Sequence, residues 1–318
     1  MPSIIKVIVH GSSANLGPGF DVFSISLETF TDEVEAWLEH DGEGVVIDRI
    51  EGPHANGIPH DKNTLLESAR LVLQKTRFTE ARLVLRLYKG VPPGKGLGSS
   101  GASAAAGAVA ASILTGARLN IDELVKISGQ AEAVVSGSPH YDNVTASLLG
   151  GFVVVSNIRS DLVFKRADLD ALFLVAVPHV DMGSEKTRKM RSVIPERIPL
   201  EVAARQWGKT ALMIIAATRG DLELFGSLMM SDEVVEPARS SYIPCYHNVR
   251  SAAIEAGALG VSVSGAGPSL LVLLGSSSNH ADVEAVKKAV LEAYSGCGIS
   301  VDVYVSRVGG GYDVLVSD

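Results

Sequence analysis

The sequence contains few cysteines and fewer positive than negative charges. Its 318 residues include only Cys245 and Cys297, whose spacing fits no metal-binding motif and leaves open whether they form a disulfide. Lys and Arg number 28 against 36 Asp and Glu, so the formal net charge is -8. This balance argues against nucleic acid or an anionic membrane as the main partner, although a helix N-terminus can still hold a small anion.

The chain also lacks the pattern of a membrane span and that of a secretory signal. An uncharged stretch of 22 residues, Gly96 to Ala117, consists mostly of Gly, Ala and Ser, which gain little on leaving water. The amino-terminal run MPSIIKVIVH has neither a long apolar core nor a small-residue cleavage site. No internal repeat, low-complexity segment or long linker is evident. We therefore expect a globular, cytoplasmic protein.

The length of the chain favours two domains that share an interface. Alternating and β-branched runs predict strands at 4–9, 33–38, 45–50, 82–88, 152–156, 171–177, 261–264, 270–274 and 301–306. Helical periodicity and cap residues predict helices at 63–75, 99–114, 121–135, 199–218, 221–229, 247–256 and 281–294. The second half suits an antiparallel sheet with helices on one face. A soft boundary between Asn157 and Asp170 predicts domains at 1–160 and 161–318.

A glycine-rich loop precedes the helix predicted at 99–114. Gly96, Gly98 and Gly101 satisfy G-x-G-x-x-G, but the acidic strand end that a dinucleotide fold needs about 20 residues later is replaced by a capped helix. Glycines allow close approach, and the free N–H groups and dipole at a helix start favour a phosphate. Tight packing of small residues against neighbouring elements would explain the same glycine-rich sequence equally well.

Three stretches together resemble the motifs of the GHMP small-molecule kinases. They are PPGKGLGSS at Pro92 to Ser100, GSSANLGPGFD at Gly11 to Asp21, and SGAGPS at Ser264 to Ser269. The resemblance spans nearly the whole chain. It implies an α+β, two-domain GHMP kinase fold, with a ribosomal protein S5 domain 2-like N-terminal domain that contains a left-handed βαβ unit. A ferredoxin-like C-terminal domain would follow, with the site between the two.

Within this superfamily, four features resemble the homoserine kinase family. They are SANLGPGFDVF, the HYDN run at His140 to Asn143 with Tyr141 in place of the usual proline, Thr187 with Arg191, and EPAR ending at Arg239. The resemblance implies ATP- and Mg2+-dependent phosphorylation of the side-chain hydroxyl of L-homoserine, a step toward threonine. The expected partners are these small molecules, and a homodimer is one assembly that the sequence leaves open.

The resemblance also implies roles for individual residues. Ser100 and Glu132 would hold the metal, and Asn143 and Arg191 would act in catalysis. The expected ATP-binding residues are Asn63, Pro93, Gly94, Lys95, Gly96, Leu97, Gly98, Ser99, Ser100 and Gly101. The expected substrate-binding residues are Asn15, Asp21, His140, Asn143, Thr187, Arg191 and Arg239.

Several of these residues also have ordinary structural interpretations. Asn63 can be a plain helix cap, Asn15 and Asp21 can serve turn chemistry, and arginines are usually solvated. Because the amide of Asn143 cannot accept a proton at neutral pH, we expect no strong side-chain base, and His140 is favoured as an orienting group. Two alternatives stay open: another GHMP kinase such as a mevalonate kinase, and a nucleotide-binding module without catalysis.

Overall fold

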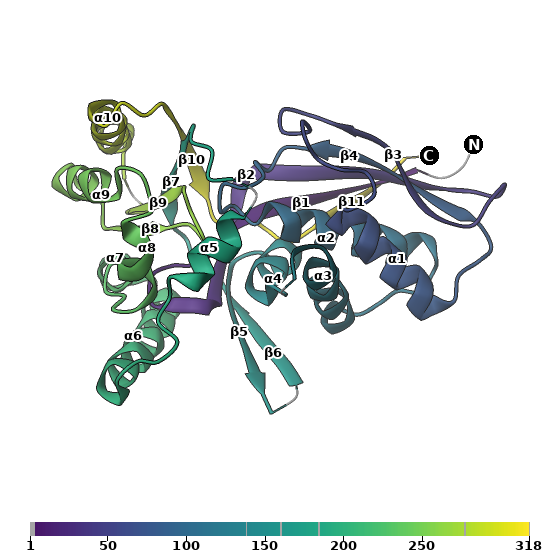
Figure 1. Cartoon of the computed structure of the whole chain (residues 1–318), viewed down its shortest axis with the longest axis horizontal. Helices are drawn as coiled ribbons and strands as arrows, with labels where there is room; N and C mark the ends of the chain where they lie inside the picture. The colour runs from purple at the N-terminus through teal and green to yellow at the C-terminus, as the bar shows by residue number, and fades with distance from the viewer. Residues whose placement is uncertain (1–3, 138, 160, 184, 277, 318) are drawn as a thin grey trace.

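The computed structural model describes residues 4–137, 139–159, 161–183, 185–276 and 278–317. Two β-sheets with their helices lie end to end, and the helix α5 (Lys186–Ser192) lies between them (Figure 1). The first half contains β1 (Ile4–Asn15), β2 (Gly19–Glu39), β3 (Gly44–Glu51), α1 (Thr64–Thr76), β4 (Arg82–Lys89), α2 (Ser99–Leu114), α3 (Ile121–Ser136), α4 (Tyr141–Leu149), β5 (Phe152–Ile158) and β6 (Asp161–Ala167). The second half contains β7 (Leu172–Pro178), α5 (Lys186–Ser192), α6 (Leu200–Arg219), α7 (Leu222–Met229), α8 (Val235–Ser240), α9 (Tyr246–Glu255), β8 (Gly260–Val263), β9 (Leu270–Leu274), α10 (His280–Gly296), β10 (Val301–Arg307) and β11 (Asp313–Ser317).

The larger sheet has seven strands, with the order β11-β1-β2-β4-β3 and a β5–β6 hairpin branching from β2. The long strand β2 serves both branches, because residues 32–39 pair with β4 and residues 23–25 pair with β5. The strands β3 and β4 are parallel and are joined through α1, which makes a βαβ unit. Helices α1 to α4 lie along one face of this sheet (Figure 1).

The helix starts in the first half follow local sequence signals. Asn63 caps α1 by accepting a hydrogen bond from Leu65 N, and Asn120 forms a capping box with Glu123 at α3. Helix α2 has no side-chain cap, and its small residues allow close packing: a Cβ on Gly107 would lie 2.2 Å from the Leu65 carbonyl oxygen. Small-residue packing is therefore real within α2. No helix in the described ranges could span a bilayer.

The smaller sheet has four antiparallel strands in the order β10-β7-β9-β8, as the sequence predicts for the second half. Leu172 and Leu174 of β7 pack in one apolar cluster with side chains of α9 and α10. Phe173, on the opposite face, belongs to the larger cluster, which also contains Phe225 of α7 and Phe152 of β5. The prediction of helices on one face thus describes only α9 and α10, because the other face packs against α7 and the first half.

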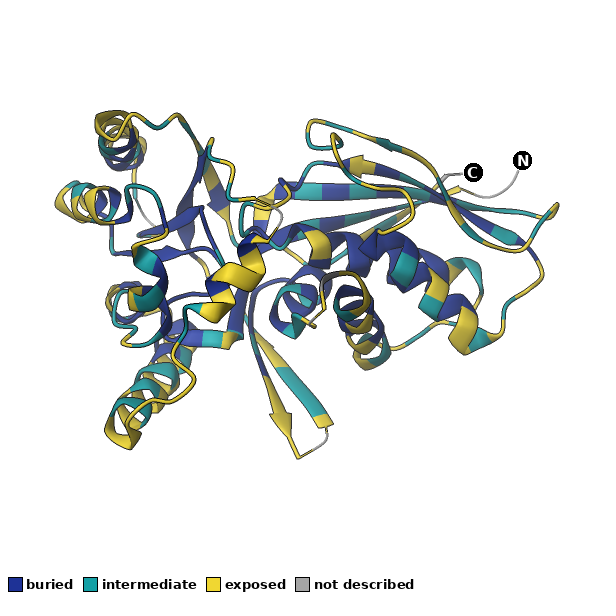
Figure 2. Cartoon of the chain, in the orientation of Figure 1, coloured by how far each residue is buried: buried dark blue, intermediate teal, exposed yellow. Residues whose placement is uncertain are grey.

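Two strands after residue 160 belong to the larger sheet. The strand β6 pairs antiparallel with β5, and the hairpin they form is exposed at its outer end (Figure 2). The strand β11 pairs antiparallel with β1, so that Ser317 lies opposite Ile4 (Figure 1). The regions 1–160 and 161–318 therefore share one sheet, and the chain crosses between them more than once.

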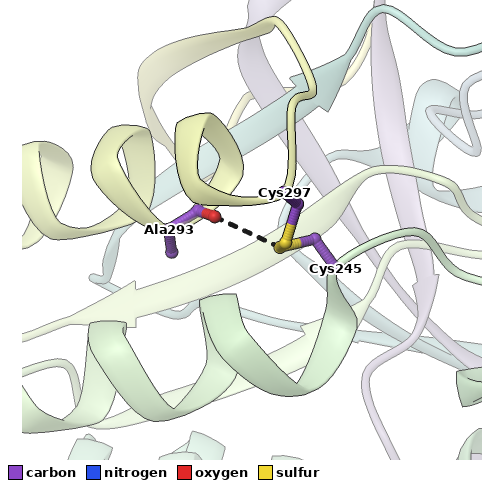
Figure 3. Close-up of a disulfide and its surroundings, with 3 residues drawn as sticks. All are labelled: Cys245, Ala293 and Cys297. Atoms are coloured by element: carbon purple, nitrogen blue, oxygen red, sulfur yellow. Dashed lines mark hydrogen bonds between the residues drawn. A yellow bond between two sulfur atoms is a disulfide. The ribbon is translucent and has the colours of Figure 1, made fainter.

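Cys245 and Cys297 form a disulfide, a pairing that the sequence left open. Cys245 directly precedes α9 and Cys297 directly follows α10, so the bond joins the two helices that cover one face of the smaller sheet (Figure 3). Their Cα atoms are 6.2 Å apart, and the sequence separation is 52 residues. The Cys245 sulfur lies 3.2 Å from the Ala293 carbonyl oxygen in the last turns of α10 (Figure 3).

Candidate active site

A cavity of about 380 Å³ lies where the two halves meet. Its walls come from the glycine-rich loop and the start of α2, from the segment before α1, from α3 and α4, and from α5 with the second glycine loop. The lining residues are 56–59, Lys62, Asn63, Thr64, Lys89, Pro93, Gly94, Gly96, Leu97, Gly98, Ser99, Ser100, Ser103, Glu132, Val135, His140, Asn143, Lys186, Thr187, Gly265 and Ala266. The three stretches that carry the resemblance thus come together in space, because both glycine loops line this cavity and Gly11 to Asp21 contacts them.

The glycine-rich loop delivers the N-terminus of α2 to the cavity. Gly98 caps the helix with a left-handed φ of 64° and offers no side-chain oxygen to the first turn. A Cβ on Gly96 would lie 2.2 Å from the Ser264 carbonyl oxygen, and one on Gly98 would lie 2.0 Å from Ser12 Oγ. Only glycine fits these positions. The N-cap residue of this 16-residue helix therefore offers no side-chain acceptor to the first backbone N–H groups, which could accept an anion instead.

A buried ion pair holds both ends of this loop. Lys89, at the end of β4, donates to Asp32 Oδ2 and to the Ser99 carbonyl oxygen, the latter at 2.9 Å. Asp32 Oδ1 accepts hydrogen bonds from the backbone N–H groups of Gly90 and Val91. Ser99 Oγ closes the loop by donating to the Val91 carbonyl oxygen at 3.0 Å. Burial lowers the pKa of Lys89, and the Asp32 carboxylate opposes that effect.

Ser100 and Glu132 form the oxygen pair that could hold a cation. Ser100 Oγ donates to Glu132 Oε1 at 2.6 Å, and His140 Nδ1 lies 3.8 Å from Glu132 Oε2. Glu132 is 1% exposed, and burial, with a further contribution from Asp142, raises its pKa to about 8. A hydroxyl and a carboxylate are the hard oxygen donors that Mg2+ takes in phosphate sites, and a divalent cation would favour the ionised carboxylate. These residues therefore fit the metal.

No group of three or more His, Cys, Asp or Glu side chains in the described ranges forms a metal centre of its own.

Asn143 lies beside the start of α2. Its Oδ1 accepts a hydrogen bond of 2.9 Å from Ser12 Oγ, and its backbone N–H and Nδ2 donate to Asp142 Oδ1 at 2.8 and 3.1 Å. The Asp142 carboxyl is 3% exposed and does not line the cavity, and burial together with Asp21 raises its pKa to about 7. The amide group of this HYDN run therefore faces the cavity, while the adjacent acid is turned into the protein.

Next to the cavity, Asp21, Arg191 and Arg239 form a charged cluster around an aromatic ring. Arg191 Nη2 donates to both carboxylate oxygens of Asp21 at 3.0 and 3.1 Å. The guanidinium carbons of Arg191 and Arg239 lie 5.3 and 5.2 Å from the centroid of the Phe20 ring. A carboxylate next to two guanidinium groups, each able to form a bidentate contact, is complementary in charge to a zwitterion.

Arg239 is the buried member of this cluster, at 4% exposure. Its Nε donates to the Met190 carbonyl oxygen at 2.9 Å and its Nη1 to the Gly265 carbonyl oxygen at 3.2 Å. Burial lowers its pKa to about 10, and Asp21 opposes that effect. Burial also lowers the pKa of His140, which the charges of Arg191, Asp21 and Arg239 affect further. His140 therefore lies in the cavity wall within electrostatic range of the charged cluster.

Some expected residues have other contacts. Lys95 is absent from the cavity wall, because its ammonium donates to the Pro178 and Val180 carbonyl oxygens, each at 2.9 Å. Asn15 is also absent, since Nδ2 donates to the Gly265 carbonyl oxygen at 2.9 Å and Oδ1 accepts from Asp21 N.

Asn63 lines the cavity, but its side chain caps α1 and donates to the Pro59 carbonyl oxygen. Gly101 is not part of the cavity wall and packs against Asn143, whose Cβ would lie 3.2 Å from an added Cβ. Thr187 lies in the wall as expected. Sequence reasoning missed Lys89 and Lys186, which line the cavity, and Ser12, which donates to Asn143, because no local pattern marks these contacts.

Comparison with known proteins places both halves in one superfamily. The model of the GHMP kinases N terminal domain matches residues 63–151, and that of the GHMP kinases C terminal domain matches residues 213–296. Homoserine kinase of Aeropyrum pernix is 44% identical over 277 residues, which are 87% of this chain and 88% of that protein. Homoserine kinase of Thermoplasma volcanium is 37% identical over 98% of this chain and 97% of its own length.

Solved structures agree with these matches. The crystal structure of homoserine kinase from Cytophaga hutchinsonii has a TM-score of 0.89 at 33% identity and covers 98% of this chain and 97% of that one. The mevalonate kinase of L. major, solved with R-mevalonate, has a TM-score of 0.72 at 20% identity over 96% and 97% of the two chains. At that identity the likeness concerns the fold alone.

Proposed function

We propose a mechanism for this chain, which belongs to the GHMP kinases and, within them, to the homoserine kinase family. The chain is a phosphotransferase with an alcohol as acceptor, and its function is the phosphorylation of homoserine. GHMP kinases use ATP as the phosphoryl donor. The observation that carries the mechanism is the position of an uncapped helix N-terminus and the Ser100–Glu132 pair beside the cluster of Asp21, Arg191 and Arg239.

The nucleotide would lie along the cavity with its phosphates at the start of α2. Gly94 to Ser100 would hold the phosphates through backbone N–H groups and the helix dipole. The segment 56–59 and Asn63 would enclose the base at the other end. Ser100 and Glu132 would hold Mg2+, which neutralises charge on the phosphate oxygens when bound. Held in this way, the triphosphate would be positioned for transfer, and phosphoryl transfer depends chiefly on such positioning.

Homoserine would lie between these phosphates and the charged cluster. Arg191 and Arg239 would fork onto its carboxylate, and Asp21 would accept hydrogen bonds from its ammonium. Asn143 would orient the hydroxyl, with Thr187 and His140 completing the wall. The hydroxyl oxygen forms a bond to the γ-phosphorus while the bond to the bridging oxygen of ADP breaks. Because an amide cannot accept a proton, the hydroxyl proton passes to an oxygen of the phosphoryl group.

The acceptor can be identified with purified protein. ADP release would be followed with homoserine, serine, mevalonate, galactose and shikimate at matched concentrations. We expect the highest kcat/KM with homoserine. A higher value with mevalonate would contradict the proposed substrate pocket, and no turnover with any alcohol despite ATP binding would indicate a nucleotide-binding module.

A further inference from the structure

Lys186, the first residue of α5, places its ammonium between the two glycine loops. Its Nζ donates to the Gly94 carbonyl oxygen at 3.0 Å and also to the Gly267 carbonyl oxygen. The residue is 6% exposed and lines the cavity. A cation from the second half of the chain is therefore held against the phosphate loop of the first half.

Among the described residues, no carboxylate pairs with this buried cation. The charged groups that act on it are Arg239 of α8 and Lys95 of the loop, and both are positive. Its ammonium donates hydrogen bonds to two backbone carbonyl oxygens. Burial and these two cations lower its pKa to about 8. Since a buried charge is costly without a partner, the site favours binding of an anion.

One donor of the ammonium remains available to a ligand. An ammonium has three N–H groups, and the carbonyl oxygens of Gly94 and Gly267 accept two of them. No acceptor among the described residues takes the third, and Lys186 shares the cavity wall with Gly96 and Ser100. The third N–H is therefore free to meet an anion inside the cavity.

We propose that Lys186 binds the terminal phosphate of the nucleotide and stabilises the charge on the phosphoryl group during transfer. This role rests on the proposed function, because it takes the triphosphate to lie along the loop. Lys186 directly precedes Thr187 on the helix that also carries Arg191, so it stands between the phosphates and the homoserine pocket. Lys186 keeps its proton while the γ-phosphorus leaves ADP for the homoserine oxygen, and supplies charge to the phosphoryl oxygens.

The loop's own lysine does not take this role. Both N–H donors that Lys95 uses go to carbonyl oxygens of Pro178 and Val180, away from the cavity. Lys89 also lines the cavity but is paired with Asp32, whereas Lys186 contacts both glycine loops and comes from α5, on the other side of the interface. Nucleotide binding and the position of α5 are consequently coupled.

The test compares nucleotides with and without the third phosphate. Dissociation constants for ADP and for a nonhydrolysable β,γ-methylene ATP analogue would be measured by calorimetry, with Mg2+ and without homoserine. In Lys186→Met we expect the analogue to bind about 10- to 100-fold more weakly and ADP to change by less than about threefold. Lys186→Arg should recover part of the loss. An equal loss for both nucleotides, or no loss, would overturn the proposal.

Two further measurements separate this role from a structural one. Lys189→Met removes the same charge from the exposed side of α5 and should leave both dissociation constants unchanged. In turnover assays, Lys186→Met should lower kcat about 100-fold with little change in the KM for homoserine. Should this variant unfold at a lower temperature, Lys186→Gln keeps a donor for the two carbonyl oxygens and should show the same difference between the nucleotides.

The outcome is independent of the acceptor. Because calorimetry requires no alcohol, selective loss of the analogue would support the phosphate contact even if the wild-type chain left homoserine unphosphorylated, a result that would contradict the proposed function alone. Conversely, the wild-type chain could phosphorylate homoserine while Lys186→Met changes the dissociation constants of ADP and the analogue equally. This result would overturn the role of Lys186 alone.

Discussion

Asp21 and Arg191 form an ion pair with each other across the interface between the two halves, although each is proposed to bind an opposite charge of homoserine. Both carboxylate oxygens of Asp21 accept from Arg191 Nη2, at 3.0 and 3.1 Å. The two side chains are 45% and 43% exposed, so the pair is open to exchange. A zwitterionic substrate can replace it charge for charge, whereas a ligand with only one charge would leave either the carboxylate or the guanidinium without its partner.

Arg191→Ala tests the carboxylate contact. We expect the KM for homoserine to rise about 10- to 100-fold, because a charge-assisted bidentate contact is lost, while the KM for ATP changes little. Steady-state kinetics with each substrate varied in turn would measure this. Arg188→Ala is the matched control, since Arg188 lies on the same helix, is exposed and pairs with Glu185. Equal increases in both KM values would contradict the role of Arg191.

Asp21→Asn tests the ammonium contact. The wild-type protein should prefer homoserine to 4-hydroxybutyrate, which lacks the amino group, and the variant should lose about 10-fold or more of this preference. The ratio of the two kcat/KM values measures the effect and is insensitive to the amount of active protein. A ratio that Asp21→Asn leaves unchanged would place the ammonium elsewhere.

Glu132→Gln tests the metal site. The change keeps the shape of the buried side chain that accepts from Ser100, but removes the charge that a divalent cation requires. We expect kcat to fall about 100-fold or more and the Mg2+ concentration for half-maximal activity to rise. Asp122→Asn removes an exposed carboxylate from the same helix and serves as the control. An unaltered Mg2+ dependence in Glu132→Gln would exclude the ligand role.

Glu236 should make the protein less stable as the pH rises. Burial raises its pKa to about 7 from the ordinary value of 4.5, although Tyr246 OH and Val263 N donate to its carboxylate and Arg250 lies nearby. The folded state therefore binds more protons than the unfolded state between about pH 4.5 and 7, and stability falls through this window. Between these pH values, the free energy of unfolding should decline less in Glu236→Gln than in the wild-type chain. The difference between the two declines should be up to about 3 kcal/mol.

Urea unfolding of Glu236→Gln and the wild-type chain at pH 5, 6 and 7 would measure this difference. The comparison cancels contributions from other buried acids such as Glu132 and Asp142, whose pKa values burial also raises. Parallel stability profiles for the two proteins would show that Glu236 ionises as readily in the folded state as in the unfolded one.

The disulfide should contribute measurably to stability. Cys245 and Cys297 close a long loop across α9 and α10, and we expect Cys297→Ser to lower the free energy of unfolding by about 2–4 kcal/mol. A reducing agent should lower the stability of the wild-type chain and leave the variant unchanged. Detection of two reactive thiols in the native wild-type protein would contradict the bond.

Local sequence signals predicted many elements because the interactions that form them are local. The side chains of Asn63 and Asn120 accept hydrogen bonds from backbone N–H groups two or three residues away. The helix starts at these positions can therefore be predicted from the local sequence. The loop glycines and Ser100 were found the same way. Elements without such signals were missed: α4 follows His140, which provides no side-chain cap, and β11 is a short strand that pairs with β1 from the other end of the chain.

By itself, the sequence determined the family, the order of most helices and strands, and which residue types stand in the loops of the site. Only the tertiary structure decided how their side chains are used. It turned Lys95 toward Pro178 and Val180, and brought Lys186 of α5 to the glycine-rich loop. The physical reason is that a lysine stem can reach in many directions, and the choice depends on which distant carbonyl oxygens and charges the fold places within its reach.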